Sequence, residues 1–266
     1  MNSFISWVGA KTKLASYIVS KFSSHKGYTE IFGGGASILF HKKVSKAEIY
    51  NDVNRELTNL FIVVRDKSEE LNRLINWSLS NREIFDSYRS MNGTDISQLA
   101  PVERAFRYYY LIKNAFGSNP MGSFSSCRTA PIRWNPLVEL APYRDRLAKV
   151  TIENLHFDDL VKKYDCEDML FYADPPYYVA EGKKYYEFDF GEKDHLMLFN
   201  RLKDIKGKFV VSYDDVPEVR ELYKDFLITL TDPITYTLSK GDNISKKELL
   251  IFNYEPPKDG QRELIL

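Results

Sequence analysis

Short apolar runs near both ends of the chain alternate with segments of helical periodicity. The spacing of Leu14, Ile18 and Phe22 predicts one apolar helical face. Apolar runs with the length of buried strands span residues 28–32, 47–51, 150–154, 169–173, 208–213, 226–230, 234–238 and 249–254. Because strands and helices alternate at this spacing, the pattern predicts an α/β fold with a parallel sheet and right-handed crossovers.

The middle of the chain interrupts this strand pattern. Helical periodicity dominates from about residue 68 to residue 148, and residues 115–135 form a loop rich in Gly, Ser, Asn and Pro. A loop of this length that carries spaced apolar residues predicts a structured, hairpin-like segment. We therefore expect a sheet domain made of residues 1–77 and 150–266, with residues 78–149 as a helical insertion.

Composition is typical of a globular protein with one large core, or one core and a smaller lobe. The chain has 266 residues, of which 44% are hydrophobic and 28% are charged. It contains no apolar run of about 18 residues and no signal-peptide pattern, which favours a cytoplasmic protein. Its two cysteines predict neither a disulfide framework nor a cysteine-only zinc site.

Net charge is zero, but the basic residues are unevenly distributed. Residues 101–149 contain eight Lys and Arg against three Asp and Glu, an excess of five. This excess would allow the insertion to contact nucleic acid, although most local excesses of this size are only solvated surface.

Asp174-Pro175-Pro176-Tyr177 directly follows the apolar run 169–173. Two consecutive prolines cannot donate ladder hydrogen bonds, so the strand must end there. The motif thereby places an acid, a carbonyl and an aromatic ring at a strand's carboxyl end, where open α/β sheets bind ligands. Taken alone, the tetrapeptide is equally consistent with a turn that carries a surface Tyr.

A glycine triplet, Gly33-Gly34-Gly35, follows the first predicted strand and precedes a predicted helix. Glycines allow the backbone to approach a ligand closely, and the start of the helix presents free amides. Asp52 stands 17 residues after Gly35, at the end of the next predicted strand, where an acid can bind ribose hydroxyls. The alternative role for Asp52 is a helix N-cap, and the two roles can coexist.

These motifs, taken in order, resemble those of the Dam-type DNA adenine methyltransferases of the D12 class, alpha group. The stretches that carry the resemblance are residues 4–11, 29–37, 51–54, 174–177 and 246–254. The resemblance implies a Rossmann-like S-adenosylmethionine-dependent methyltransferase sheet with an inserted target-recognition domain. It also implies methyl transfer to the N6 amine of adenine in double-stranded DNA, with the target base flipped out. It further implies a monomeric protein of bacterial or phage origin that takes part in restriction-modification.

The catalytic residues implied by the resemblance are Asp174, Pro175 and Tyr177. An exocyclic base amine is a poor nucleophile because its lone pair is delocalised into the ring. The Asp174 carboxylate and the Pro175 carbonyl can accept its two hydrogens, and Tyr177 can stack on the flipped base. Neither cysteine lies in a loop that fits covalent attack at cytosine carbon.

The same resemblance implies a set of cofactor contacts. Lys11 would pair with the methionine carboxylate and Trp7 would pack on the cofactor, whereas the alternatives are a solvated lysine and a core tryptophan. The predicted S-adenosylmethionine site comprises Trp7, Lys11, Glu30, Gly33, Gly35, Asp52, Phe157 and Asp174. No metal is implied. Residues 178–190 are predicted to close over the flipped base, and His25, His41 and His195 are expected at the surface.

Several positions depart from the family pattern. Ala10 replaces a glycine, Ile31 replaces a proline, and His156 stands where the family has Asp. The insertion lacks the family's usual recognition sequence, so no target site is implied. The predicted DNA contacts are Lys113, Asn114, Asn119, Arg128 and Arg133.

Two other functions remain open from the sequence. One is methyl transfer to RNA or to a protein amide. The other is a DNA-binding protein that has lost catalysis. Asp174 favours the DNA enzymes over the first, and the intact catalytic tetrapeptide counts against the second.

Overall fold

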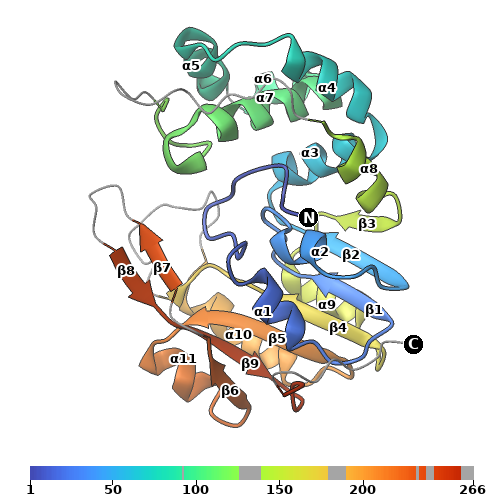
Figure 1. The fold of residues 1–266 in the computed structure, drawn as a ribbon, viewed down its shortest axis with the longest axis vertical. Coiled ribbons are helices and arrows are strands. Elements are labelled where there is room, and N and C mark those ends of the chain that lie inside the picture. Colours follow the sequence, from blue (N-terminus) through green and yellow to red (C-terminus); the bar gives the residue numbers. More distant parts are fainter. Residues whose placement is uncertain (92, 126–138, 179–189, 232–233, 238–242, 259–266) are drawn as a thin grey trace.

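A seven-stranded sheet forms the centre of the protein (Figure 1). The computed structural model describes residues 1–91, 93–125, 139–178, 190–231, 234–237 and 243–258. The strand order is β3 (Val150–Glu153), β2 (Ala47–Asn51), β1 (Gly27–Glu30), β4 (Met169–Ala173), β5 (Lys208–Asp214), β9 (Glu248–Phe252) and β6 (Leu227–Leu230). Strands β1 to β5 are parallel, and β9 runs antiparallel to both β5 and β6.

The strand order reverses beside β1. This strand pairs with β2 on one side and with β4 on the other, so consecutive crossovers leave in opposite directions. Ligands of open α/β sheets bind at such a switch point, outside the carboxyl ends of the strands. The predicted Rossmann-like α/β fold is confirmed, and Glu30, Asn51 and Asp174 all lie at this edge.

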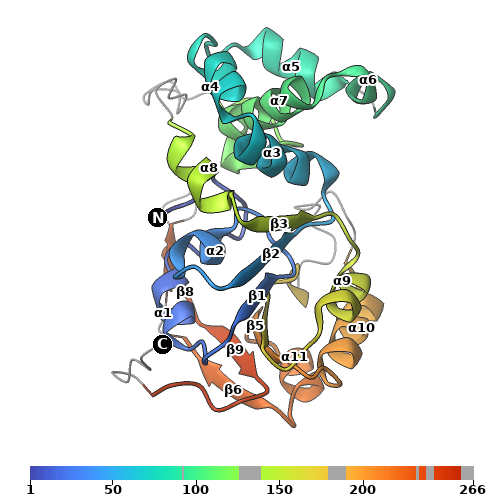
Figure 2. The same cartoon turned by 90° about the vertical axis from the view of Figure 1, so that its right-hand side faces the viewer.

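Helices cover both faces of the sheet (Figure 2). One face carries α1 (Ala15–Ser20) and α2 (Ser37–His41), and the other carries α9 (Phe157–Tyr164), α10 (Glu192–Leu202) and α11 (Pro217–Leu222). Side chains of β4 alternate between the two layers. Leu170 and Tyr172 pack into one core, whereas Phe171 and Ala173 pack into the other. The sheet is therefore buried on both faces, as its continuous apolar strands require.

A helical lobe lies beyond the β3 edge of the sheet (Figure 1). It contains α3 (Arg55–Asp66), α4 (Ser68–Asn76), α5 (Arg82–Ser90), α6 (Gly93–Gln98), α7 (Pro101–Asn114), the 3₁₀ turn η1 (Phe116–Ser118) and α8 (Ala141–Leu147). The core of this lobe is continuous with the α1–α2 layer, because Phe4 packs on Phe61 and Tyr143. The Tyr110 hydroxyl donates to the carbonyl of Leu79 at 2.8 Å and thereby fixes the α4–α5 connection to α7.

The observed elements follow the predicted pattern, with one addition. Strand β8 (Asn243–Lys246) pairs with β7 (Ile234–Thr237) in a separate antiparallel hairpin. Its sequence, Asn-Ile-Ser-Lys, has a single apolar residue, so hydrophobic patterning cannot identify it. In the loop predicted to be hairpin-like, Ala115 forms an antiparallel bridge with Phe124, and residues 126–135 of this loop lie outside the described residues.

In the described ranges, none of the helices combines the length and apolarity that crossing a membrane requires.

Candidate active site

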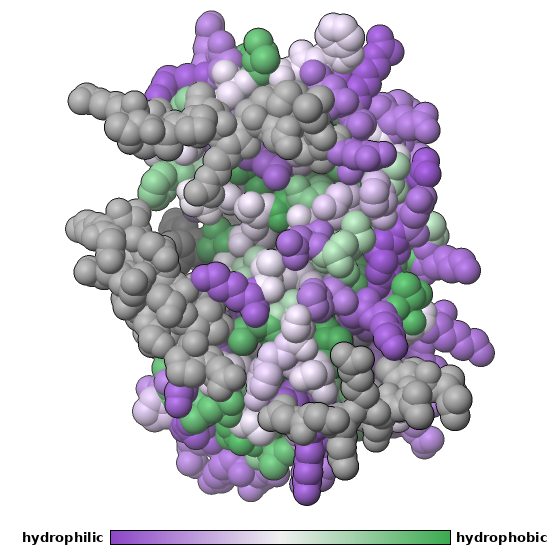
Figure 3. Space-filling view, in the orientation of Figure 1, coloured by the Kyte–Doolittle hydropathy of each residue, from purple (hydrophilic) through white to green (hydrophobic). Residues whose placement is uncertain are grey.

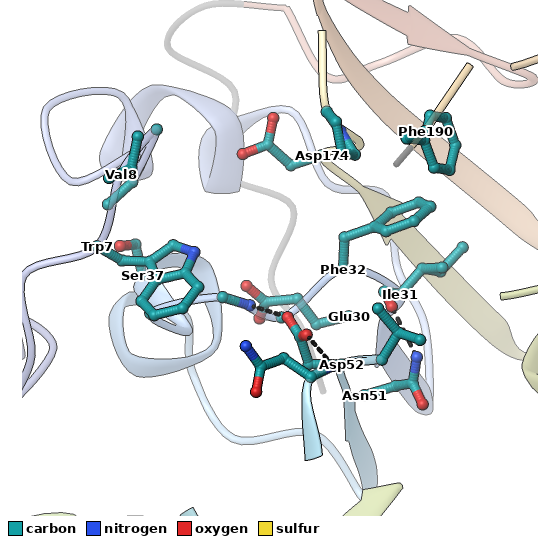
Figure 4. A pocket seen from close by; sticks show the side chains of 18 of the residues that line it. Trp7, Val8, Glu30, Ile31, Phe32, Ser37, Asn51, Asp52, Asp174 and Phe190 are labelled. Atoms are coloured by element: carbon teal, nitrogen blue, oxygen red, sulfur yellow. Dashed lines mark hydrogen bonds between the residues drawn. The ribbon is translucent and has the colours of Figure 1, made fainter. Parts of the chain in front are cut away.

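A cavity of about 300 Å³ opens at the carboxyl ends of β1, β2 and β4 (Figure 4). This volume lies in the range of small-molecule sites, about 300–1,000 Å³. Its walls include all eight residues predicted to bind cofactor: Trp7, Lys11, Glu30, Gly33, Gly35, Asp52, Phe157 and Asp174. The face shown in Figure 3 is hollowed between the helical lobe and the sheet domain, and apolar side chains show in the hollow.

The glycine loop is fixed by two aromatic rings. Gly34 has a φ of 47°, and a Cβ there would lie 2.8 Å from the indole of Trp7. A Cβ at Gly33 would clash with the ring of Tyr50. Both glycines are thus required by the protein's own packing, and Trp7 is held beside the loop as a wall of the cavity.

Asp52 ties the end of β2 to this loop. Its Oδ2 accepts from the Gly34 amide and its Oδ1 from the Asn54 amide, each at 2.8 Å. The N-cap of α3 is Asn54, whose side chain accepts from the amides of Glu56 and Leu57. The alternative N-cap role for Asp52 is therefore wrong, and its carboxylate belongs to the cavity wall.

Replacing Asp52 with alanine should weaken S-adenosylmethionine binding about tenfold or more, the scale of one lost hydrogen bond to a charged group. The substitution also leaves the Gly34 amide without its acceptor, which loosens the loop. Calorimetry without DNA measures this affinity, with exposed Asp66→Ala on α3 as the control. Equal affinities for Asp52→Ala and the wild type would exclude Asp52 from the cofactor site.

Glu30 is a buried carboxyl in the cavity wall, with only 2% of its surface exposed. Its Oε2 accepts from the hydroxyl of Tyr28 at 3.1 Å and from the amide of Leu39 at 2.9 Å. Burial raises the pKa of Glu30 from its usual 4.5 to about 8. The carboxyl is thus mostly protonated at neutral pH, and once it loses its proton it can pair with a cation.

Three phenylalanine rings form the apolar side of the cavity. Phe157 lies 5.7 Å from Phe32 and 5.8 Å from Phe190, measured between ring centroids. Phe32 stands directly after Ile31 in the glycine motif, so its position could have been read from the sequence. The ring planes are tilted by 42° and 54°, and an apolar wall of such rings can pack on a flat aromatic ligand.

The Asp174 carboxylate lies at the end of β4 with 18% of its side chain exposed. Lys11 Nζ contacts Oδ1 at 2.7 Å and Oδ2 at 2.8 Å, and Ser212 Oγ donates to Oδ1 at 2.9 Å. Burial raises the pKa of Asp174, and the Lys11 ammonium opposes this shift. Lys11 therefore lines the cavity, but its ammonium binds the predicted catalytic acid.

The other two catalytic candidates flank this acid. Pro175 is buried, and Tyr177 is partly exposed, with its ring centroid 4.8 Å from Lys11 Nζ. Burial raises the pKa of Tyr177 well above its usual value, so the ring remains neutral. Tyr177 can offer an uncharged aromatic face beside Asp174.

The insertion supplies part of the cavity wall, which the sequence did not predict. Tyr108 on α7 and residues 118–121 line the cavity, and Asn54 Nδ2 donates to the Tyr108 hydroxyl at 2.8 Å. Asn119, predicted to contact DNA, lies in this segment. The insertion and the cofactor motif around Asp52 are therefore joined directly.

The other residues predicted to contact DNA do not share the position of Asn119. Asn114 is fully buried, and its amide donates to the carbonyl of Tyr110 at 2.9 Å. The prediction that Asn114 reads DNA is wrong, because its side chain is bound inside the lobe. Lys113 is half-buried, 5.5 Å from the Tyr109 ring centroid, and Arg128 and Arg133 lie outside the described residues.

His195 was expected at the surface but is 2% exposed. Its Nδ1 lies 2.7 Å from the Tyr213 hydroxyl, and its ring centroid lies 4.7 Å from that of Tyr178. Burial lowers the pKa of His195 to about 4, so the imidazole is neutral at pH 7. His195 thus packs on Tyr178, the residue after Tyr177. Most of the segment predicted to close over the flipped base, residues 179–189, lies outside the described residues.

Comparisons with known proteins show which family this chain is similar to. The sequence pattern of the family described as D12 class N6 adenine-specific DNA methyltransferase matches residues 7–234. Type II methyltransferase M1.LlaDCHI of Lactococcus lactis subsp. cremoris is 27% identical, over 96% of each chain. The Retron Ec67 DNA adenine methylase of Escherichia coli is 22% identical, over 85% of this chain and 82% of the relative.

Among solved structures, the precorrin 8W decarboxylase encoded by gene MT0146 of Methanobacterium thermoautotrophicum is similar with a TM-score of 0.40. It is 10% identical and is matched over 90% of this chain and 88% of its own. A likeness at this level adds nothing to the argument from strand order.

Proposed function

The chain belongs to the D12 class N6 adenine-specific DNA methyltransferase family, and we propose that it methylates an adenine flipped out of double-stranded DNA, with S-adenosylmethionine as donor. The observation that carries this proposal is the position of Asp174. Its carboxylate faces the same cavity as Glu30 and Asp52, so an acceptor amine and a bound donor can meet there (Figure 4).

The chemistry of the cavity fits S-adenosylmethionine. The Asp52 carboxylate can accept from ribose hydroxyls, and the Phe32 and Phe157 rings can pack on an adenine. Glu30, once ionised, can pair with the ammonium of the methionine moiety. S-adenosylmethionine supplies an activated sulfonium methyl group when it is bound. The protein's part is to align an amine with it.

Asp174 and Pro175 would orient that amine. A carboxylate oxygen and a carbonyl oxygen can accept its two hydrogens and favour a pyramidal nitrogen as positive charge develops. The neutral ring of Tyr177, beside Asp174, would stack on the flipped base. The same groups would stabilise the cationic amine until its proton leaves.

We place DNA against the insertion. Lys113, Asn119, Arg128 and Arg133 remain the proposed contacts, and the local basic excess supports them. Phosphate contacts by basic side chains position a duplex, and polar side chains that reach base edges specify its sequence.

Replacing Tyr108 with phenylalanine should weaken S-adenosylmethionine binding about fivefold, because it removes the acceptor of the Asn54 amide near the cofactor motif. Tyr88→Phe, in the same lobe, serves as the control because the Tyr88 ring packs on Phe106 and Tyr110 away from the cavity. Calorimetry with the isolated protein measures both. If the two variants bind equally well, the insertion contributes only space to the cofactor site.

The function is tested with S-adenosylmethionine labelled in its methyl group. Purified protein should label duplex DNA and leave RNA and protein unlabelled, and the product should be N6-methyladenine. Sequencing native DNA from cells that express the protein, with detection of modified bases, gives the target site in the same step. Label in RNA or protein alone, or no label at all, would refute the proposal.

A further inference from the structure

The Lys11 ammonium lies near two carboxylates, Asp174 and the buried Glu248. Its Nζ is 2.7 Å from Asp174 Oδ1 and 3.7 Å from Glu248 Oε2. The side chains of Lys11 and Glu248 are only 4% and 5% exposed. The Gly9 carbonyl accepts from the same ammonium at 3.2 Å, and the Tyr177 ring centroid is 4.8 Å away.

Three neighbouring strands build this cluster. Asp174 follows β4, Ser212 lies on β5, and Glu248 is the first residue of β9. The Glu248 amide donates to Thr231 Oγ1 at 3.0 Å, and the Thr231 amide donates to the Glu248 carbonyl at 2.9 Å. Glu248 is therefore held by the pairing of β9 with its neighbours, with its carboxylate 3.7 Å from the ammonium.

Lys11 and the target amine compete for the same acceptor. A carboxylate offers about four lone-pair sites. Lys11 contacts both oxygens of Asp174, and Ser212 occupies a further site on Oδ1. Three of these sites are thus occupied, and an amine that takes the remaining one on Oδ2 would share that oxygen with the ammonium, whose charge repels the positive charge that develops on the amine.

The ammonium has a second partner within reach. A shift of about 1 Å toward Glu248 would bring Nζ into the hydrogen-bond range of about 2.7–3.2 Å. The ammonium would remain beside the Tyr177 ring during this shift, which preserves a cation–π contact. A buried ammonium without any carboxylate partner would be strongly disfavoured, so the second carboxylate makes the displacement feasible.

We propose that Lys11 passes from Asp174 to Glu248 when the target amine binds, and that Glu248 is a positioning residue for methyl transfer. The inference rests on the proposed function. With Lys11 on Glu248, the Asp174 carboxylate regains a free acceptor for the amine. Glu248 acts on the reaction through the position of Lys11, and its carboxylate also lies near enough to the Tyr177 hydroxyl to help raise the pKa of that group.

The test replaces Glu248 with glutamine, which keeps the shape of the side chain and removes its charge. Without the second carboxylate, Lys11 stays on Asp174, and the single-turnover rate of methyl transfer to DNA should fall about 10- to 100-fold, the scale of one contact to a charged group. Affinities for S-adenosylmethionine and for DNA should stay within about twofold of the wild type, because neither ligand is contacted. Glu221→Gln, on the exposed surface of α11, is the matched control and should keep the wild-type rate.

A double-mutant cycle separates positioning from general distortion. In a Lys11→Met background, Glu248→Gln should change the rate less than twofold, because Glu248 then has no ammonium to hold. The same loss in both backgrounds would overturn the inference, as would a wild-type rate for Glu248→Gln. If the wild-type protein transfers no methyl group to DNA, the proposed function is wrong, and so is the proposed passage of Lys11 to Glu248.

Discussion

Replacing Asp174 with asparagine should reduce methyl transfer about 100- to 1000-fold, the loss expected when one preorganised electrostatic contact is removed. Asparagine fits the space of the carboxyl and still offers one oxygen, but it carries no charge to stabilise a cationic amine. Asparagine is preferable to alanine because its amide oxygen can still accept from the buried Lys11 ammonium, whereas alanine leaves no acceptor at this position. Breaking a buried ion pair in this way costs about 3–5 kcal/mol and would confuse folding with catalysis.

The measurement is a single-turnover assay with labelled S-adenosylmethionine and duplex DNA, with thermal unfolding as a check of the fold. Asp168→Ala is the control, since Asp168 lies just before β4 and forms an exposed ion pair with Lys26. Near-normal turnover by Asp174→Asn would remove Asp174 from the chemistry.

A second large effect concerns pH and Glu30. The pKa of this carboxyl is about 8 in the folded protein, whereas an exposed glutamate, as in the unfolded chain, has a pKa of 4.5. Between these two values the folded state holds a proton that the unfolded state has released. The contribution of Glu30 to stability should therefore be greatest below pH 4.5 and fall as pH rises toward 8, by up to about 1.4 kcal/mol per unit and about 3–5 kcal/mol in total.

Glu30→Gln tests this directly, because the amide oxygen still accepts from Tyr28 and Leu39 but cannot titrate. Urea unfolding at pH 5, 6, 7 and 8 should show the wild type losing stability relative to the variant, and Glu69→Gln on the exposed face of α4 should follow the wild type. Saturating S-adenosylmethionine should reduce the wild-type loss, because an adjacent ammonium favours the ionised carboxyl. Parallel curves for the wild type and Glu30→Gln would contradict the assignment.

The sequence predicted most of the sheet and one side of the site for a common physical reason. Asp52 and Asp174 each follow an apolar run that ends at a strand terminus, and parallel strands bring such termini to one edge. The local sequence pattern is therefore enough to predict that these two side chains lie at the same edge of the sheet. Phe157 was predicted from the family resemblance instead, and it is the first residue of α9, the helix after β3.

Contacts between distant segments could not be predicted in this way. Glu248 meets Lys11 only because β9 inserts next to β5, and periodicity does not specify which strands pair. Tyr108 looks like any core residue of an amphipathic helix, and its hydroxyl becomes informative only beside Asn54. Asn114 was misassigned for the converse reason, since a polar residue at the end of a helix can satisfy its amide within its own lobe.

The hydrogen bond between Asn54 and Tyr108 bears on any attempt to build chimaeras with new sequence specificity. Exchanging the helical segment between relatives would seem a modular operation, because it enters and leaves the sheet domain through α3 and α8 (Figure 2). The donor segment, however, also replaces Tyr108 and residues 118–121 in the wall of the cofactor cavity. A graft should retain cofactor affinity if it keeps the host's Asn54, Tyr108 and residues 118–121. The crossover points of such a chimaera therefore lie after Tyr108 and leave residues 118–121 unchanged.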